Sequence, residues 1–301
     1  MRIGVDFGGT KIEAAVLTAD GAFSARLREP NPGDYDAAIA TVGRLIARVE
    51  AQAGMTPGGP VGLAVPGSPS PQTGLMRNAN STWLNGRAFG ADLEAALGRP
   101  VRLANDADCL AVSEARDGSG AGARTVFAAI LGTGCGGGVV VDGRLVSGAN
   151  GIAGEWGHTP LPWSDDDEHP GPDCWCGRRN CLELWLSGSG LQRDHQTRTG
   201  HALTAQAIVA QARADDAGAA RTLDRFTDRL GRALAVVADI LDPDVFVLGG
   251  GLSNVDEIYG RLPPLVARHV FADRWQGRIV PARWGDSSGV RGAAWLWDAA
   301  G

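Results

Sequence analysis

Apolar positions in the N-terminal part of the chain follow two periods. Short apolar runs that end at Gly, Asp or Asn predict buried β-strands, and they lie at residues 2–7, 11–18, 22–29, 61–67 and 101–106. Longer segments with apolar residues three or four positions apart predict helices, at residues 35–53, 89–98 and 107–116. Asp20-Gly21 separates two of the runs and predicts a hairpin. This part should fold as a three-strand meander followed by alternating helices and strands.

The rest of the chain begins with a similar pattern. A strand, a glycine turn and a second strand are predicted at 124–141, followed by a hairpin at Asp142-Gly143 and a strand at 144–148. Further on, the pattern predicts a strand at 244–251 and helices at 183–190, 204–214, 217–241 and 287–300. Because the strand–glycine turn–strand unit occurs twice, we expect two related α/β domains, 1–117 and 118–287, with a cleft between them. The terminal helix, 288–301, should pack back on the first domain.

The net charge of the chain indicates which kinds of partner it can bind. The net charge is −6 over 301 residues, which argues against nucleic acid or an anionic membrane, since either would need a basic face. No apolar run approaches the roughly 20 residues of a membrane span, and the first ten residues lack the apolar region of a signal peptide. We therefore expect a cytoplasmic protein with small-molecule partners.

Three glycine clusters follow predicted strands. Glycine lets the backbone approach a phosphate, and a neighbouring hydroxyl or carboxylate can bind phosphate or Mg²⁺. One such cluster would be only a tight turn, but three of them, two with a threonine, predict a site for phosphate and Mg²⁺. The residues are Asp6, Gly8, Gly9, Thr10 and Lys11 (the only lysine of the chain), then Gly132, Thr133 and Gly134, then Gly249, Gly250 and Gly251.

A carboxylate suited to proton transfer lies where a predicted strand meets a helix. Asn105-Asp106 occupies that junction. Phosphoryl transfer to a hydroxyl needs a carboxylate that accepts the proton and orients the attacking oxygen. An aspartate that only caps the helix would explain the same position equally well.

Three of the five cysteines lie close together, at Cys174, Cys176 and Cys181. With one histidine they form a Cys₃His set, which suits a closed, structural zinc site better than a disulfide framework. His158 and His169 are both near enough in sequence to be the fourth ligand.

Taken together, DFGGTK, LGTGCGGG, GEWGH, CWCGRRNCLE and VFVLGGG resemble the motifs of the ROK family of bacterial sugar kinases and repressors. The resemblance spans nearly the whole chain. It implies a two-domain actin-like (RNase H-like) sugar-kinase fold that closes on ATP and a hexose, with a zinc-bound loop at 158–181 and a homodimer. It also implies roles for single residues: Asp106 as general base, Asn105, Glu155, His158 and Glu183 as sugar ligands, and His158 as the fourth zinc ligand.

The loop NANSTWLNG, which contains Asn80, is polar and suits hydroxyl recognition. A surface loop without a binding role would have the same composition. This loop, together with RLANDADCLAVSEA, GEWGHTPLPW and GDSSGVRGAAWLW, resembles the fructokinase branch, which implies D-fructose phosphorylated on its 6-hydroxyl. The alternatives are mannose, glucose or N-acetylglucosamine as substrate, or a sugar-sensing regulator without kinase activity. Two residues depart from the family pattern, Asp108 where a second asparagine is common and Asn180 where glycine is common. Asparagine tolerates the left-handed backbone, so we expect the turn at Asn180 to be kept.

Overall fold

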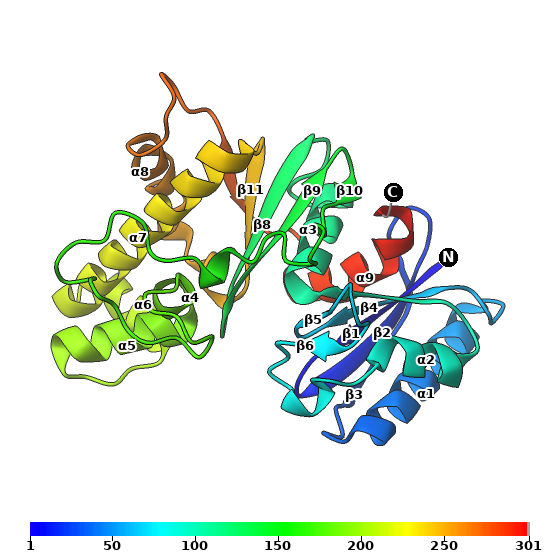
Figure 1. Cartoon of the computed structure of the whole chain (residues 1–301). Helices are drawn as coiled ribbons and strands as arrows, with labels where there is room; N and C mark the ends of the chain where they lie inside the picture. Colours follow the sequence, from blue (N-terminus) through cyan, green and yellow to red (C-terminus); the bar gives the residue numbers. More distant parts are fainter. Residues whose placement is uncertain (300–301) are drawn as a thin grey trace. The chain divides into compact units, whose positions relative to one another are not determined.

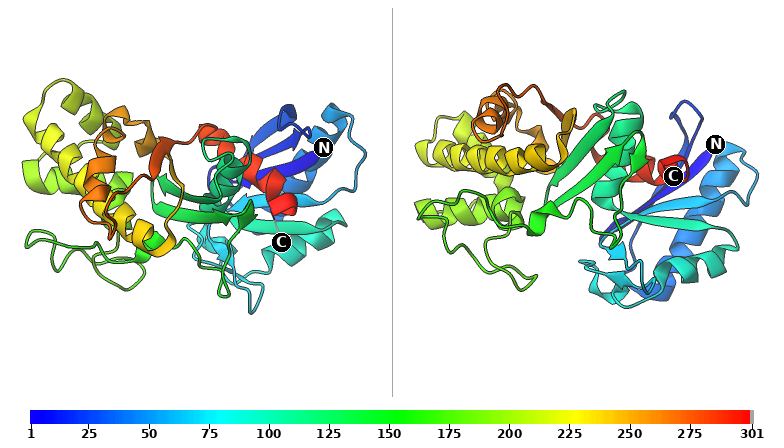
Figure 2. Two further views of the ribbon diagram at one scale, coloured as in Figure 1. Left: turned by 90° about the horizontal axis from the view of Figure 1, so that it is seen from above. Right: turned by 45° about the horizontal axis from the view of Figure 1, so that its top comes forward.

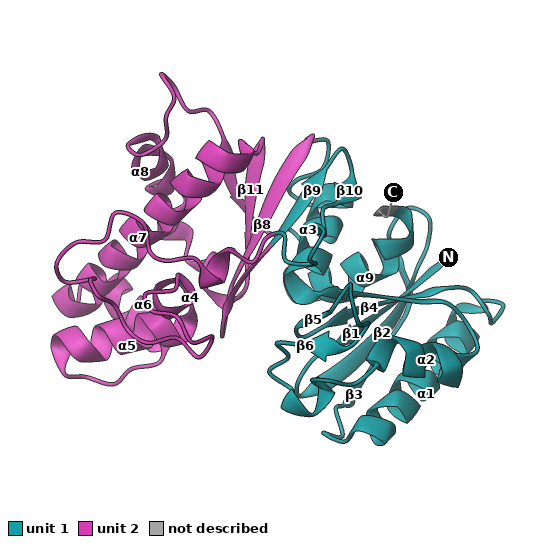
Figure 3. Ribbon diagram, viewed as in Figure 1, with its two compact units in different colours: residues 1–122, 138–153, 283–301 teal, residues 123–137, 154–282 magenta. Residues whose placement is uncertain are grey.

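The computed structural model describes residues 1–299, and the chain divides into two compact units (Figure 3). Unit 1 comprises residues 1–122, 138–153 and 283–301, and unit 2 comprises residues 123–137 and 154–282. Residues 118–122, 138–153 and 283–287, which we expected in the second domain, therefore belong to unit 1. Residues 300 and 301 of the expected terminal helix lie outside the described residues.

Unit 1 is built on a five-stranded sheet with the order β3-β2-β1-β4-β7 (Figure 1). The first three strands form the predicted antiparallel meander, and β4 and β7 lie parallel to β1. The strands are β1 (Arg2–Phe7), β2 (Lys11–Leu17), β3 (Phe23–Pro30), β4 (Val61–Val65) and β7 (Val101–Asn105). A short hairpin, β5 (Ser68–Pro69) with β6 (Met76–Arg77), was not predicted. Each of the five predicted strands is confirmed to within two residues.

Successive residues of β1 face opposite sides of this sheet, and the two sides differ in what covers them. Ile3, Val5 and Phe7 belong to the main hydrophobic core together with residues of helix α1 (Tyr35–Ala53). The opposite face carries Gly4, where an added Cβ would lie 2.1 Å from the Val290 carbonyl of helix α9 (Ser288–Ala299). Small residues on this face let α9 pack directly on β1 and β4 (Figure 2). The remaining helices of unit 1 are α2 (Phe89–Leu97) and α3 (Asp106–Asp117).

Helix boundaries follow local signals in the sequence. α1 begins after Asp34, whose side chain accepts a hydrogen bond from the Ala37 N–H, and it ends at Gly54 with φ +62°. An aspartate cap and a left-handed glycine satisfy backbone groups that a helix leaves unpaired at its two ends. These signals explain why residues 35–53 could be assigned from sequence alone.

Unit 2 contains three parallel strands, β8 (Thr125–Leu131), β11 (Val245–Gly249) and β12 (Arg278–Pro281). The chain turns after β8 into β9 (Cys135–Val141), which begins in unit 2 and continues into unit 1. There β9 pairs with β10 (Arg144–Leu145), which is shorter than the predicted strand at 144–148. β12 was not predicted, because its four residues carry no clear alternation.

The helices of unit 2 are α4 (Glu183–Leu186), α5 (Gly188–Thr199), α6 (Ala205–Arg213), α7 (Ala217–Leu241) and α8 (Leu262–Ala267). α6 and α7 confirm the prediction, whereas the predicted helix at 183–190 ends early. It ends because Ser187 is extended (φ −90°, ψ 166°) and its side chain caps α5 through the Gly190 N–H. α5 is rich in polar residues and glycine, and α8 is very short, so neither was predicted. None of the helices among residues 1–299 is long and apolar enough to cross a bilayer.

Candidate functional site

Asp6, which is predicted to bind Mg²⁺, and the Asn105-Asp106 pair, which is predicted to contact the sugar, lie at one edge of the unit 1 sheet. Asp6 is near the carboxyl end of β1, and Asn105 ends β7. β1, β4 and β7 are parallel, with Asp6 paired to Ala64 and Asn105 paired to Val65. The carboxyl ends of parallel strands form one edge, which is where open α/β sheets bind ligands. Asp6 and the Asn105-Asp106 junction are therefore brought to the same edge.

The carboxyl group of Asp6 has an unusual environment. Burial raises its pKa to about 6, and the negative charges of Glu13 and Asp106 act in the same direction, while Lys11 and Arg28 oppose them. Glu13 is itself buried and accepts hydrogen bonds from Arg26 at 2.6 Å and Arg28 at 2.6 Å. A buried carboxylate beside other carboxylates is stabilised in its charged form by a divalent cation. Asp6 therefore fits the predicted Mg²⁺ as an oxygen donor.

Asp106 is not the cap of helix α3. The cap is Asn105, whose Oδ1 accepts the Asp108 N–H at 2.6 Å. Asp106 is the first helical residue, its side chain is exposed, and its Oδ1 accepts the Ala107 N–H at 2.9 Å. The capping explanation of this pair therefore applies to Asn105, and the carboxylate of Asp106 is accessible to a substrate.

The glycine turns of unit 2 line a cavity of about 620 Å³, which is within the size range of nucleotide and drug sites. Gly250 has φ +83° and ψ 176°, a region open almost only to glycine. A Cβ there would lie 2.7 Å from the Leu131 carbonyl carbon. The walls come from both turns and from α5 and α6, among them Gly132, Thr133, Gly188, Ser189, Gln206, Arg213, Gly251 and Asn254.

The start of α5 holds the first of these turns in place. The Gly188 N–H donates to the Gly132 carbonyl at 2.7 Å, and the Ser189 hydroxyl donates to the Thr133 carbonyl at 3.3 Å. Sequence reasoning missed this support, although the small residues after Ser187 were its visible signal. The turn that should bind phosphate is thus held through its own backbone carbonyls, by one backbone N–H and one side-chain hydroxyl of α5.

The four predicted metal ligands form one cluster in unit 2. Their ligand atoms lie within 4.8 Å of one another. The Cys176 and Cys181 sulfurs are 3.6 Å apart, and the Cys174 sulfur is 3.7 Å from His158 Nδ1. A tetrahedral zinc with Zn–S bonds of about 2.3 Å requires sulfurs roughly 3.8 Å apart. The cluster therefore has dimensions suited to zinc, and His158 rather than His169 completes it.

Backbone pairing explains the choice of histidine. The Leu161 N–H donates to the Asn180 carbonyl at 2.8 Å, and the Leu182 N–H donates to the Thr159 carbonyl at 2.8 Å. These bonds place the His158 segment beside Cys181. Asn180 has φ +59°, so the turn expected at this departure from the family pattern is kept.

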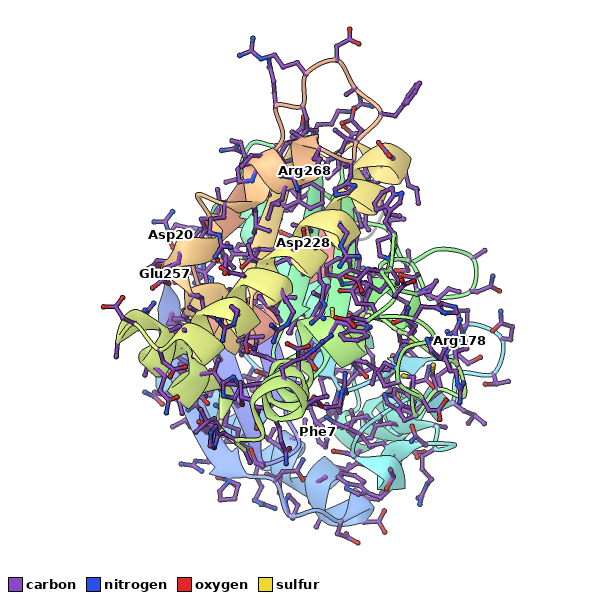
Figure 4. All side chains as sticks on the ribbon, turned by 90° about the vertical axis from the view of Figure 1, so that its left-hand side faces the viewer. Phe7, Asp20, Arg178, Asp228, Glu257 and Arg268 are labelled. Carbon is purple, nitrogen blue, oxygen red and sulfur yellow. The ribbon has the colours of Figure 1, made fainter. Side chains whose placement is uncertain are left out.

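The three thiols differ in acidity. Burial, the largest single effect, raises the pKa of Cys176, but hydrogen bonds with Arg178 and with the other two cysteines together outweigh it and lower the pKa to about 6. Arg178 lies on the exposed side of this loop (Figure 4). Burial raises the pKa of Cys181 to about 12. Metal ligation requires thiolates, and Cys176 is the thiol of the cluster that ionises most readily.

A buried ion network ties the loop between His158 and Cys174 to helix α7. Glu168 has 4% of its side chain exposed and accepts hydrogen bonds from Arg229 at 2.7 Å and from Arg232 at 2.8 and 2.9 Å. Arg232 also donates to the Pro162 and Trp163 carbonyls. Asp228, one turn earlier on α7 (Figure 4), pairs with Arg232 at 2.9 Å. The acidic stretch SDDDEHPGP, which the sequence predicts to be a loop, is therefore held against α7 by buried ion pairs.

Glu183 contacts both the strand that follows the glycine turn at 132–134 and the loop that carries the predicted metal ligands. One of its oxygens, Oε2, accepts the Cys135 N–H at 3.2 Å, and the other, Oε1, accepts the indole N–H of Trp175 at 2.7 Å. Of the other predicted sugar ligands, Glu155 is exposed immediately before the 3₁₀ turn that carries His158, and Asn80 is exposed on its loop in unit 1. The sequence did not predict the contact of Trp175 with Glu183 or the burial of Glu168 against α7.

Solved structures of known proteins share the fold of this chain. The structure superposes on a ROK hexokinase from Thermus thermophilus with a TM-score of 0.87 at 31% identity, covering 98% of this chain and 96% of that chain. It superposes on a ROK family glucokinase from Streptomyces griseus, solved in complex with glucose and AMPPNP, with a TM-score of 0.79 at 26% identity, covering 98% of both chains. The predicted α/β sugar-kinase fold is confirmed.

The sequence profile of the ROK family matches residues 2–300, so the chain belongs to the ROK family. An N-acetyl-D-glucosamine kinase of Pasteurella multocida (strain Pm70) is 39% identical over 98% of this chain and 99% of its own length. The N-acetylgalactosamine kinase AgaK of Shewanella sp. (strain ANA-3) is 40% identical over 98% of this chain and 96% of its own length. The expected fructokinase branch is not confirmed, because these relatives are named for N-acetylated hexosamines.

Proposed function

We propose that this ROK-family sugar kinase transfers the γ-phosphoryl group of ATP to the 6-hydroxyl of N-acetylglucosamine. The observation that carries the choice of sugar is the identity of about 39% with N-acetyl-D-glucosamine kinases over nearly the full length of both chains. This replaces fructose, the substrate expected from the sequence, with one of its stated alternatives.

Asp106 is the general base in this proposal. Its carboxylate is exposed at the carboxyl edge of the unit 1 sheet, where it can accept the proton of the attacking hydroxyl and orient that oxygen. Asn105 fixes the start of α3 and thereby the position of Asp106. Such a base contributes about 10²–10⁴-fold to the rate.

ATP binds in unit 2 in this proposal, with its phosphates on the backbone N–H groups of the turns at Gly132–Gly134 and Gly249–Gly251. The cavity of about 620 Å³ beside both turns has room for the nucleoside. Mg²⁺ neutralises phosphate charge when bound, and Asp6 is its protein ligand, directly or through water. The glycine turn after Asp6 is held by the Gly8 N–H, which donates to the Lys11 carbonyl at 2.9 Å. Phosphate binding by this turn stays a prediction.

Zinc at His158, Cys174, Cys176 and Cys181 is structural, because four protein ligands leave no open position. It holds in place the loop that begins at His158 and is flanked by Glu155 and Glu183. All three are proposed sugar ligands, and the two glutamates accept hydrogen bonds from sugar hydroxyl groups. The predicted homodimer stays a prediction.

The test is ADP release from ATP and Mg²⁺ with five sugars at equal concentration: N-acetylglucosamine, N-acetylgalactosamine, glucose, mannose and fructose. The highest kcat/KM should be that for N-acetylglucosamine, and Asp106→Asn should lower kcat by about 10²–10⁴-fold for every sugar. Highest activity on fructose would restore the substrate expected from the sequence. Activity that persists in Asp106→Asn would remove Asp106 as base.

A further inference from the structure

Trp175 is the least buried aromatic side chain in contact with the proposed sugar ligands. Its neighbours in sequence, Cys174 and Cys176, are both members of the predicted metal cluster. Yet 65% of the side chain is exposed. A single exposed apolar side chain is ordinary by itself, so the contacts of Trp175 decide what its exposure means.

The contacts of Trp175 are with two of those proposed ligands. Its indole N–H donates to Glu183 Oε1 at 2.7 Å, and its ring meets the His158 ring edge-to-face at a centroid distance of 4.9 Å. A carboxylate oxygen has more than one lone pair. Glu183 Oε1 can therefore accept a sugar hydroxyl while it still accepts the indole N–H.

Other exposed apolar side chains do not share these contacts. Trp163 lies on the same loop and is 53% exposed, but its ring stacks on His269 at 4.7 Å. Ile240 and Phe271 are exposed elsewhere in unit 2. Among the large exposed apolar residues of the described chain, Trp175 is the one that contacts both His158 and Glu183.

We propose that Trp175 is a specificity-determining residue that selects sugars with a 2-acetamido group over plain hexoses. The ring supplies the apolar surface that the acetamido methyl group needs, and the indole N–H orients Glu183 for any hexose. This inference rests on the proposed function, because it concerns the same sugar site.

Two roles in one side chain can be separated by substitution. Trp175→Phe keeps a ring but removes the N–H, whereas Trp175→Gln keeps an N–H donor but removes the ring. One methyl group in an apolar pocket changes discrimination by about 10–200-fold. Because most of the side chain is exposed, neither substitution removes much buried surface, and Trp163→Gln is a matched control on the same loop.

The experiment measures kcat/KM for N-acetylglucosamine and for glucose in the wild type and the three variants, with zinc content and Tm for each. The ratio of the two values should fall about tenfold or more in Trp175→Gln, with kcat/KM for glucose within about threefold of wild type. The ratio should persist in Trp175→Phe, while kcat/KM falls for both sugars. Trp163→Gln should match wild type both in this ratio and in kcat/KM for each sugar.

An unchanged ratio in zinc-loaded Trp175→Gln would overturn the proposal. Loss of zinc from both Trp175 variants, with Trp163→Gln intact, would show a structural role and overturn it as well. Failure of the proposed function looks different, because the wild-type protein itself would then show no preference for N-acetylglucosamine.

Discussion

Replacing Glu168 with glutamine should destabilise unit 2 and loosen the metal loop. The substitution keeps the size of the side chain but removes the charge that faces Arg229 and Arg232, whose side chains are 2% and 7% exposed. Removing one partner of a buried ion pair costs about 3–5 kcal/mol. Arg229 keeps Asp194 at 3.1 Å, and Arg232 keeps Asp228 at 2.9 Å, so the lower end, about 3 kcal/mol, is expected.

For a unit of this size, 1 kcal/mol corresponds to roughly 2–4 °C, so Tm should fall by about 6–12 °C. The matched control is Asp167→Asn on the same loop. Asp167 pairs with Arg198 at 2.9 Å, but the side chains are 69% and 35% exposed. Such a surface pair contributes less than about 1 kcal/mol. Differential scanning calorimetry and the rate of zinc release would measure both variants at pH 7.

The loss of Tm in Glu168→Gln should also depend on pH. Burial raises the pKa of Glu168, but the hydrogen bonds and charges of Arg232 and Arg229 outweigh it and hold the pKa below its ordinary value of 4.5. A carboxyl with a lowered pKa in the folded state stabilises the protein above that ordinary value, and the stabilisation is lost as the pH falls. The difference in Tm between wild type and Glu168→Gln should therefore narrow below about pH 4.5. Equal Tm values for Glu168→Gln and wild type at pH 7 would refute the reasoning.

Three further changes test other parts of the structure. Cys176→Ser should leave less than one zinc per chain by elemental analysis and lower Tm, and a full zinc complement would contradict the assigned ligand set. Gly250→Ala should raise KM for ATP and lower Tm, because the backbone conformation excludes alanine and the Cβ would collide with Leu131; Gly251→Ala, which has open space, should keep the wild-type Tm. Gly62→Ala would place a Cβ 1.8 Å from the Ala293 carbonyl and should destabilise unit 1 by at least about 3 kcal/mol. A Tm unchanged from wild type would show that α9 packs less closely than described.

Much of the fold was determined locally. Strands of unit 1 could be assigned because their apolar runs end at turn residues such as Asp20-Gly21, and helix α1 because Asp34 and Gly54 mark its ends. The Cys₃ spacing indicated a metal cluster because three soft ligands within eight residues leave few other arrangements. In each case the determining interactions join residues close in sequence.

Only the tertiary structure decided the rest. Glu168 belongs to an acidic stretch that reads as solvated, yet it is buried because Arg229 and Arg232, some 60 residues later, lie on the face of α7 that covers it. Asn105 caps α3, whereas Asp106 is its first residue and has an exposed side chain, and this difference depends on where α3 begins. Trp175 became a candidate for sugar selection only once its indole was found on Glu183, because exposure and contact partners are properties of the folded chain, and no local pattern encodes them.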